Sequence, residues 1–185
     1  MGLDTRRLSP LLLVAGAVCA VLVASGVSAA PNNPPRAARG GLTVGQAPPP
    51  LAATRLAGTE AVTLQGLAGR VVVLDFWATW CRPCRAIMPV LDAMYRRHRD
   101  QGLSVVGMSP ESEPRIRAHL AARPVDYTIA RDTGGTVRAY GVRGIPTLVV
   151  LDRTGVVREV MVGVDAASMR RLDGLVQRLL AEPTP

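Results

Sequence analysis

Apolar positions along the chain fall into two spacings, which predict alternating strands and helices. Predominantly apolar runs of strand length occur at 71–77, 103–108 and 147–151. After Cys81 the apolar residues recur every three to four positions, which predicts a helix that Pro89 should kink. The remaining expected elements are a hairpin around 58–59 with strands at 51–56 and 61–64, a helix near 113–122, an extended segment at 125–130, a short helix before 141, a turn at 152–155, a strand at 156–162 and a final helix at 166–181.

The order of these elements predicts an α/β domain with a central mixed sheet. Strands alternate with helices in the first half, which is typical of parallel pairing, while the turn at 152–155 joins two late strands in antiparallel fashion. Helices are expected on both faces of such a sheet.

The N-terminal 29 residues have the pattern of an export segment. Arginines at positions 6 and 7 precede an apolar run at 11–27, and the small residues at 27–29 suit signal-peptidase cleavage. The stretch 11–30 is also long enough to cross a bilayer, so a cleaved signal peptide and a membrane anchor both remain open. We therefore expect a signal peptide or signal anchor at 1–29, a flexible linker at 30–43 and one domain at 44–185, located in the periplasm or on the outer face of the cytoplasmic membrane.

The net charge of +8 does not by itself indicate nucleic-acid binding. The arginines are scattered, and the densest cluster, at 96–99, closes a predicted helix where the helix dipole favours cations. The chain has only six aromatic residues, so it offers no stacking platform interleaved with basic side chains. We expect no nucleic-acid partner.

Cys81 and Cys84 lie between a predicted buried strand and a predicted helix. The unpaired amide groups and the positive dipole end at a helix start favour a thiolate, and thiolates attack disulfides. A second thiol one turn along can resolve the mixed disulfide. The pair is therefore a candidate redox centre that needs no other cofactor.

The rest of the chain disfavours two other uses of this cysteine pair. Zinc requires four ligands, and the remaining candidates are Cys19 in the export segment and His98 and His119 in separate helices, without metal-ligand spacing. We expect no metal site. A purely structural disulfide between residues three apart would close a very small loop and contribute little stability.

Two motifs carry a family resemblance. The run 73–84, VLDFWATWCRPC, resembles the active site of thioredoxin-fold proteins, and the run 144–147, GIPT, resembles their cis-proline loop. With the export segment, the hairpin and the extra strand and helix at 103–130, residues 44–182 are similar to the TlpA/ResA-like branch of exported thiol-disulfide oxidoreductases. The resemblance implies a thioredoxin-like fold, a central mixed sheet flanked by helices, with an N-terminal hairpin and a central strand-helix insertion.

The resemblance also implies roles for the cysteine pair and its neighbours. Cys81 would be the more exposed, attacking thiol, and Cys84 the resolving thiol. Arg82 and Arg85 would add positive charge near the thiolate.

Substrate contacts are implied by the same resemblance. Pro146, if cis as in the family, would present the Ile145 backbone as a strand-like docking edge for a substrate peptide. Trp77 and Trp80 should be packing residues first, with Trp80 also shaping the surface around the dithiol. The expected substrate-contacting residues are Trp80, Arg82, Pro83, Ile145 and Pro146.

Asp75 stands inside the apolar run 71–77, where a buried, unpaired carboxylate should have a raised pKa. A raised pKa suits proton exchange with a thiol. In thioredoxins the matching aspartate lies beneath the second cysteine, so the resemblance implies that Asp75 is its general base during resolution. The open alternative is an aspartate whose hydrogen bonds are satisfied locally and which takes no part in the chemistry.

The chain departs from the TlpA/ResA-like pattern at Ile87, where many members carry a glutamate. This departure argues against direct transfer of a cytochrome c maturation role. Pro83, as the second residue between the cysteines, is typical of reductants. We expect an exported protein-disulfide reductase that acts on extracytoplasmic thiol/disulfide proteins, with apocytochrome c and copper-site cysteines as candidate substrates and a membrane dithiol as electron donor.

Two other functions remain open. One is a disulfide-forming oxidase, and the other is a copper or haem-delivery chaperone that uses the cysteine thiolates as ligands. Met88 and Met108 are candidate further ligands for Cu(I), although both also suit the core. A peroxidase is disfavoured, because Thr79 precedes Cys81 by two residues where the peroxiredoxin pattern needs three.

Overall fold

The structure, a computed structural model, describes residues 41–183 of the 185-residue chain. The predicted export segment at 1–29 and nearly all of the predicted linker at 30–43 lie outside the described residues. Within 41–183, no helix is long and apolar enough to cross a membrane.

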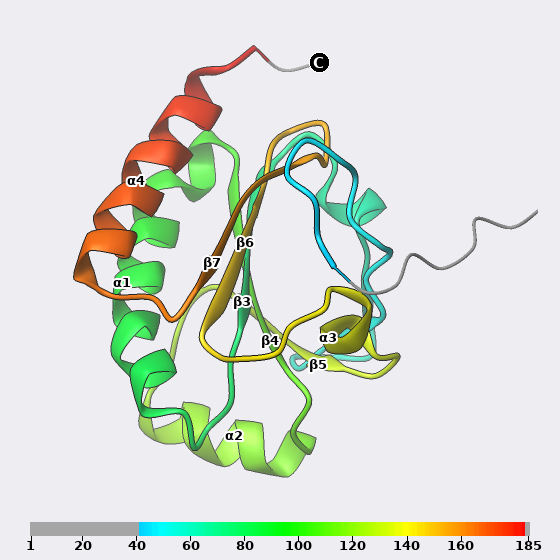
Figure 1. Cartoon of the computed structure of the whole chain (residues 1–185). Coiled ribbons are helices and arrows are strands. Elements are labelled where there is room, and N and C mark those ends of the chain that lie inside the picture. Colours follow the sequence, from blue (N-terminus) through cyan, green and yellow to red (C-terminus); the bar gives the residue numbers. More distant parts are fainter. Residues whose placement is uncertain (1–40, 184–185) are drawn as a thin grey trace, which may run out of the picture. The chain divides into compact units, whose positions relative to one another are not determined.

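One mixed sheet of seven strands forms the centre of the domain, in the order β2-β1-β5-β4-β3-β6-β7 (Figure 1). β3 pairs with β4 and β4 with β5 in parallel, while the other neighbours are antiparallel, so the predicted mixed sheet is confirmed. The strands are β1 (Ala53–Arg55), β2 (Ala61–Val62), β3 (Val71–Phe76), β4 (Leu103–Ser109), β5 (Thr128–Asp132), β6 (Thr147–Leu151) and β7 (Val157–Val162).

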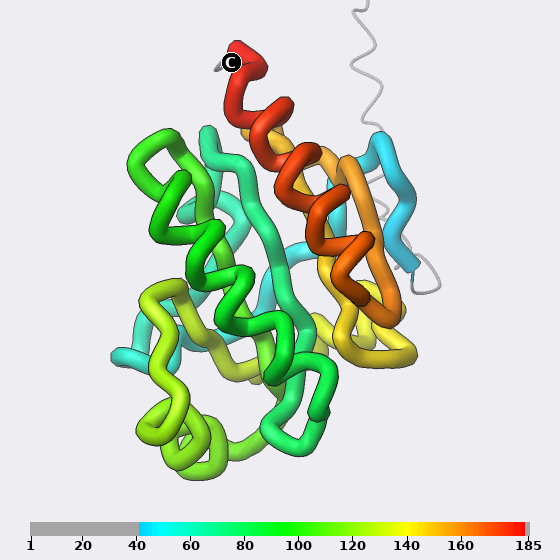
Figure 2. The backbone as a smooth tube through the Cα atoms, turned by 90° about the vertical axis from the view of Figure 1, so that its left-hand side faces the viewer, coloured from blue at the N-terminus to red at the C-terminus, as the bar shows by residue number. Residues whose placement is uncertain are grey.

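Helices cover both faces of this sheet. α1 and α4 run side by side across one face, and α2 adds its buried side chain Ile116 to the same core (Figures 1 and 2). α3 lies on the other face, together with the N-terminal segment. The helices are α1 (Arg82–His98), α2 (Glu113–Ala122), α3 (Thr136–Ala139) and α4 (Ala166–Ala181), with two 3-10 turns at Gln65–Leu67 and Arg99–Gln101.

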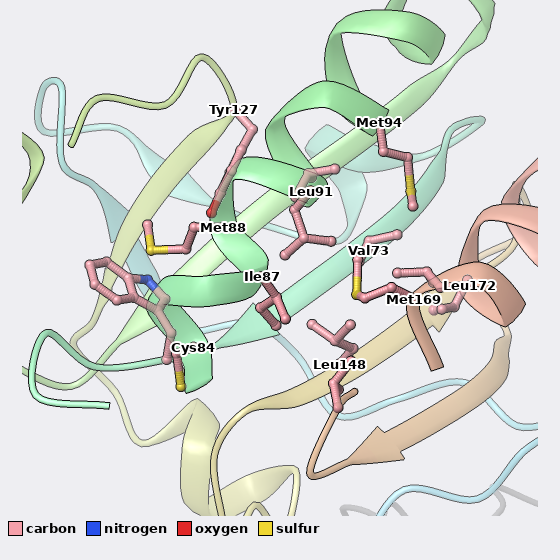
Figure 3. Packing of buried hydrophobic residues seen from close by; sticks show 14 of the residues in the cluster. Val73, Cys84, Ile87, Met88, Leu91, Met94, Tyr127, Leu148, Met169 and Leu172 are labelled. Carbon is pink, nitrogen blue, oxygen red and sulfur yellow. The ribbon is translucent and has the colours of Figure 1, made fainter. Parts of the chain in front are cut away.

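Strand β3 divides the core into two layers, because successive side chains of a strand point to opposite faces. Val71 and Val73 join the cluster under α1 and α4, whereas Val72, Leu74 and Phe76 join the cluster on the α3 side. Figure 3 shows the first cluster, in which Ile87, Leu91 and Met94 from α1 pack with Val73, Leu148, Met169 and Leu172. By the same alternation, an odd-numbered residue in β3 points toward α1.

The predicted element order is confirmed, and several boundaries differ. The hairpin strands β1 and β2 are shorter than the predicted 51–56 and 61–64, and β5 begins at Thr128 rather than at 125. α1 continues through Pro89 as one helix. Pro89 is exposed, so the carbonyl that loses its helical partner faces the solvent side of the helix.

Candidate active site

The cysteine pair sits where the end of β3 passes through a short turn into α1. The Cys81 N–H donates to the Ala78 carbonyl at 3.0 Å, which closes the turn. Cys81 is then the N-cap of α1, and its Sγ accepts the backbone N–H of Cys84 at 3.2 Å. Pro83 occupies the first turn of the helix, where its missing N–H is not needed. The predicted placement of the pair at a helix start is therefore confirmed.

Cys81 and Cys84 are joined by a disulfide, with their Cα atoms 5.3 Å apart. Cys84 is fully buried, and Cys81 is only 3% exposed. Cys81 is thus the more exposed of the two, as expected, although the bond holds its sulfur against Cys84 within the cluster under α1 in this disulfide-bonded state.

The two tryptophans near the cysteines have opposite environments. Trp77 is buried at 1% exposure, as predicted for a packing residue. Trp80 is 67% exposed, so the prediction that it packs first is wrong. Its indole forms part of the surface next to Cys81, because the turn into α1 directs this side chain outward.

The Ile145–Pro146 peptide bond is cis, as the sequence motif predicts. Thr147 Oγ1 donates to the Gly144 carbonyl at 2.6 Å, and the Gly163 N–H donates to the Pro146 carbonyl at 3.0 Å. Ile145 itself has no backbone hydrogen bond among the described residues. Its side chain shares a small hollow of about 80 Å³ with Trp80; the other lining residues are Phe76, Trp77, Ala78, Met108, Pro110, Val137 and Val142.

Asp75 is fully buried on the face of the sheet that α1 covers. Neither carboxylate oxygen has a hydrogen-bond partner among the described residues. Burial raises its pKa from the usual 3.8 to about 7, because desolvation penalises the charged form. The predicted burial and raised pKa are confirmed, and the alternative of a locally satisfied aspartate is not what the structure shows.

Glu111, which the sequence reasoning missed, braces the turn before the cysteines. Its Oε2 accepts the Thr79 N–H at 2.6 Å, and its Oε1 accepts the Thr79 hydroxyl at 2.9 Å. Arg115 pairs with the same carboxylate at 3.4 Å. The only sequence signal was its place just after β4, at the sheet edge where the carboxyl ends of parallel strands meet.

Positive charge gathers on the side of α1 that faces α2. Arg85 donates to the Thr79 carbonyl at 3.2 Å, and a pocket of about 750 Å³ is lined by Arg85, Arg96 and Arg123, by Asp92, which pairs with Arg96, and by apolar residues. Desolvation first, and then Arg123 and Arg85, lower the pKa of His119. Arg82 is exposed and forms no ion pair among the described residues.

The remaining predicted positions are distributed around α1. Pro83 lines a separate groove of about 840 Å³ between α1 and α4. Ile87 is buried at 6% exposure and packs in the core. Met88 and Met108 are also buried, in clusters on opposite faces of the sheet, so they cannot both reach a metal ion held by the cysteines. Within residues 41–183 there is no group of three or more His, Cys, Asp or Glu side chains that could hold a metal ion.

Comparisons with known proteins agree with this geometry. A family model described as AhpC/TSA matches residues 44–160. The thioredoxin-like protein YneN of Bacillus subtilis is 35% identical over 127 residues, which span 66% of this chain and 74% of that protein. The thiol-disulfide oxidoreductase ResA of Bacillus cereus is 27% identical over 140 residues, which span 75% of this chain and 79% of that protein.

Solved structures give the same result. A protein described as a thiol:disulfide interchange protein DsbE from Chlorobium tepidum superposes with a TM-score of 0.71 and 34% identity, covering 76% of this chain and 99% of that one. A protein described as a protein disulfide isomerase from Bacteroides thetaiotaomicron superposes with a TM-score of 0.70 and 26% identity, covering 76% of this chain and 92% of that one. The fold is thus thioredoxin-like, and the chain belongs to the AhpC/TSA family, as a TlpA/ResA-like thiol-disulfide oxidoreductase.

Proposed function

We propose that the protein is an exported reductant that reduces disulfides of extracytoplasmic proteins by dithiol-disulfide exchange at Cys81 and Cys84. One observation carries the proposal: the sulfur of Cys81 caps α1 and accepts the Cys84 N–H, and the sheet face that α1 covers carries the buried Asp75 carboxyl group, which has no partner among the described residues. This arrangement provides a stabilised thiolate and a resolving thiol at the start of α1, and a candidate proton acceptor in β3 beneath the same helix.

The first step is attack by the reduced form of Cys81. A thiolate on Cys81 is stabilised by the Cys84 N–H and by the positive end of the α1 dipole. Its sulfur bonds to one sulfur of the substrate disulfide, and the other substrate sulfur leaves as a thiolate. The result is a mixed disulfide between Cys81 and the substrate.

The second step releases the substrate. Asp75 accepts the proton of the Cys84 thiol, and the resulting thiolate attacks the Cys81 sulfur. The second substrate sulfur leaves, so the substrate takes up two electrons and the protein ends in the Cys81–Cys84 disulfide. A carboxyl group with a pKa of about 7 suits this task, because it is ionised in half of the molecules at neutral pH.

The substrate docks on the surface formed by Trp80 and the 145–146 loop. Trp80 is exposed beside the cysteine pair, and the free backbone groups of Ile145 can pair with an extended peptide. Arg82 and Pro83, between the cysteines, complete this surface at the start of α1.

The direction of electron flow and the location rest on the sequence and on the relatives. Pro83 in the second position favours a reductant, and the N-terminal pattern at 1–29 favours export. A membrane dithiol is the proposed electron donor, with the 11–30 stretch as a possible means of staying near it. Apocytochrome c and copper-site cysteines are the candidate substrates, and Ile87, where many TlpA/ResA-like proteins carry a glutamate, makes the first of these the weaker candidate.

A trapping experiment tests the exchange mechanism. A Cys84→Ala variant can attack but cannot resolve, so it should accumulate mixed disulfides with envelope proteins that migrate as extra bands on non-reducing gels. The matched control is the double variant Cys81→Ser/Cys84→Ala, which lacks the attacking thiol and should trap nothing. If Cys84→Ala traps no more than the control, the proposed exchange at Cys81 is refuted.

A further inference from the structure

Three buried polar groups gather beneath α1, on the face of the sheet that carries Asp75. Besides the Asp75 carboxylate, the Trp77 Nε1–H and the Tyr127 hydroxyl have no hydrogen-bond partner among the described residues. Trp77 is 1% exposed and Tyr127 is 3% exposed. Buried polar groups are almost always hydrogen-bonded, to protein or to ordered water, so three unpartnered groups on one face require an explanation.

The sheet register brings these groups into one place. Asp75 of β3 lies directly opposite Gly107 of β4, and Gly107 lies opposite Ile129 of β5. Tyr127 is two residues before Ile129, so its side chain is on the same face, and both belong to the cluster under α1.

Because Gly107 has no side chain, neighbouring side chains close directly over its backbone. A Cβ atom added at Gly107 would lie 2.8 Å from Ile129 Cδ1, 3.1 Å from Trp77 Nε1 and 3.2 Å from Tyr127 Cε2. Both aromatic side chains therefore lie directly over the one strand position that separates Asp75 from β5. Figure 3 shows the Tyr127 side chain extending under α1 toward Met88, with its hydroxyl at the inner end.

We propose that Tyr127 is a positioning residue: through ordered water shared with the Trp77 N–H, its hydroxyl stabilises the ionised carboxylate of Asp75. The inference rests on the proposed role of Asp75 in resolution. A hydroxyl and an indole N–H are both donors, and the carboxylate is an acceptor, so water between them satisfies all three groups. Burial first, and then the charges of Asp75 and Asp92, raise the pKa of Tyr127 well above 10.0, which keeps it a donor at neutral pH.

Few other titratable groups face this cluster. α1 contributes Cys84 and Asp92, and the Asp92 carboxylate is engaged in an ion pair on α1. α2 contributes His119, whose ring centroid lies 5.4 Å from that of Trp77 and whose Nε2 is also buried without a partner among the described residues. β4 and β6 present Gly107 and Leu148 opposite Asp75, and neither of these titrates. Tyr127 is thus an uncharged donor that the strand register and Gly107 bring next to Asp75.

The test is the ionisation midpoint of Asp75 in a Tyr127→Phe variant, followed through its carboxyl carbon by NMR in the disulfide-bonded protein, where Cys84 does not titrate. Loss of the donor should raise the midpoint by about one unit. The ionised fraction at about pH 7 then falls from about one half to about one tenth, and resolution slows about fivefold while the first attack is unchanged.

Tyr140→Phe is the matched control. Tyr140 is also 3% exposed with an unpartnered hydroxyl, but it packs on the opposite face of the sheet, so this variant should leave the Asp75 midpoint unchanged. A second readout needs no substitution: in the parent protein, the Cζ resonance of Tyr127 should titrate with the Asp75 midpoint, and that of Tyr140 should not.

The outcomes separate this inference from the proposed function. The inference is overturned if the Asp75 midpoint is the same in Tyr127→Phe and the parent. It is also overturned if the Tyr127 Cζ resonance does not shift with pH around the Asp75 midpoint. Neither result affects disulfide exchange. Failure of the parent protein to exchange disulfides would instead overturn the proposed function.

Discussion

A Cys81→Ser variant should lose the ability to reduce protein disulfides, by a factor on the order of a thousand or more. A serine hydroxyl is not ionised at neutral pH, even as the N-cap of α1, so no anion is available to attack the substrate. Serine is a preferred N-cap residue, and we therefore expect the helix start to be preserved. The measurement is the rate of reduction of a model protein disulfide by the pre-reduced variant.

The control for this prediction is Arg82→Ser. Arg82 is exposed at the helix start, and removing its charge should lower the rate only modestly, because exposed charges are screened by water and salt. The account of the first step is contradicted if the reduction rate of Cys81→Ser is within tenfold of the parent rate. A tenfold change in rate corresponds to about 1.4 kcal/mol in the activation free energy.

Replacing Asp75 by Asn should make the protein more stable at neutral and alkaline pH. The folded-state pKa of about 7 lies above the usual 3.8, so between these values the folded state binds more protons than the unfolded state. The free energy of unfolding is therefore highest below the unfolded-state pKa of 3.8, and it falls as the pH rises through the folded-state pKa of about 7. A difference of about three pKa units corresponds to about 4 kcal/mol, most of which Asn should recover.

Denaturant unfolding of the disulfide-bonded protein between about pH 4 and pH 8 measures this effect. The difference in unfolding free energy between Asp75→Asn and the parent should grow with pH across this window. The control is Asp100→Asn, whose carboxylate is 92% exposed and should give a difference that is small at every pH. A pH-independent difference for Asp75→Asn would show that the buried carboxyl group does not titrate near neutrality.

Much of the domain could be predicted because local patterns and tertiary structure agree. The run 71–77 is apolar on both faces because β3 is buried between β4 and β6, and α4 begins and ends as its periodicity predicts. Asp75 stood out because a single carboxylate in a buried strand has few alternatives to a raised pKa. The cysteine pair and the cis proline were identified by spacing and by the motif around them.

The features that sequence reasoning missed depend on contacts between distant segments. Glu111 acts on Thr79, 32 residues away, through a turn whose geometry no local pattern reveals. The gathering of Tyr127 and Asp75 depends on the register of β3, β4 and β5, and on the lack of a side chain at Gly107. Trp80 was expected to pack first and to shape the surface second, because apolarity does not say which way a side chain in a tight turn points.

The reduction potential of the Cys81–Cys84 pair tests the central claim most directly. The purified soluble domain would be equilibrated with a thiol-disulfide buffer, and the fraction of disulfide would be followed by mass after alkylation of the free thiols. The account predicts a single two-electron transition at about −220 mV or lower, on the thioredoxin side of the range for this fold. A potential near −120 mV would contradict it, because such a pair would install disulfides in other proteins rather than reduce them.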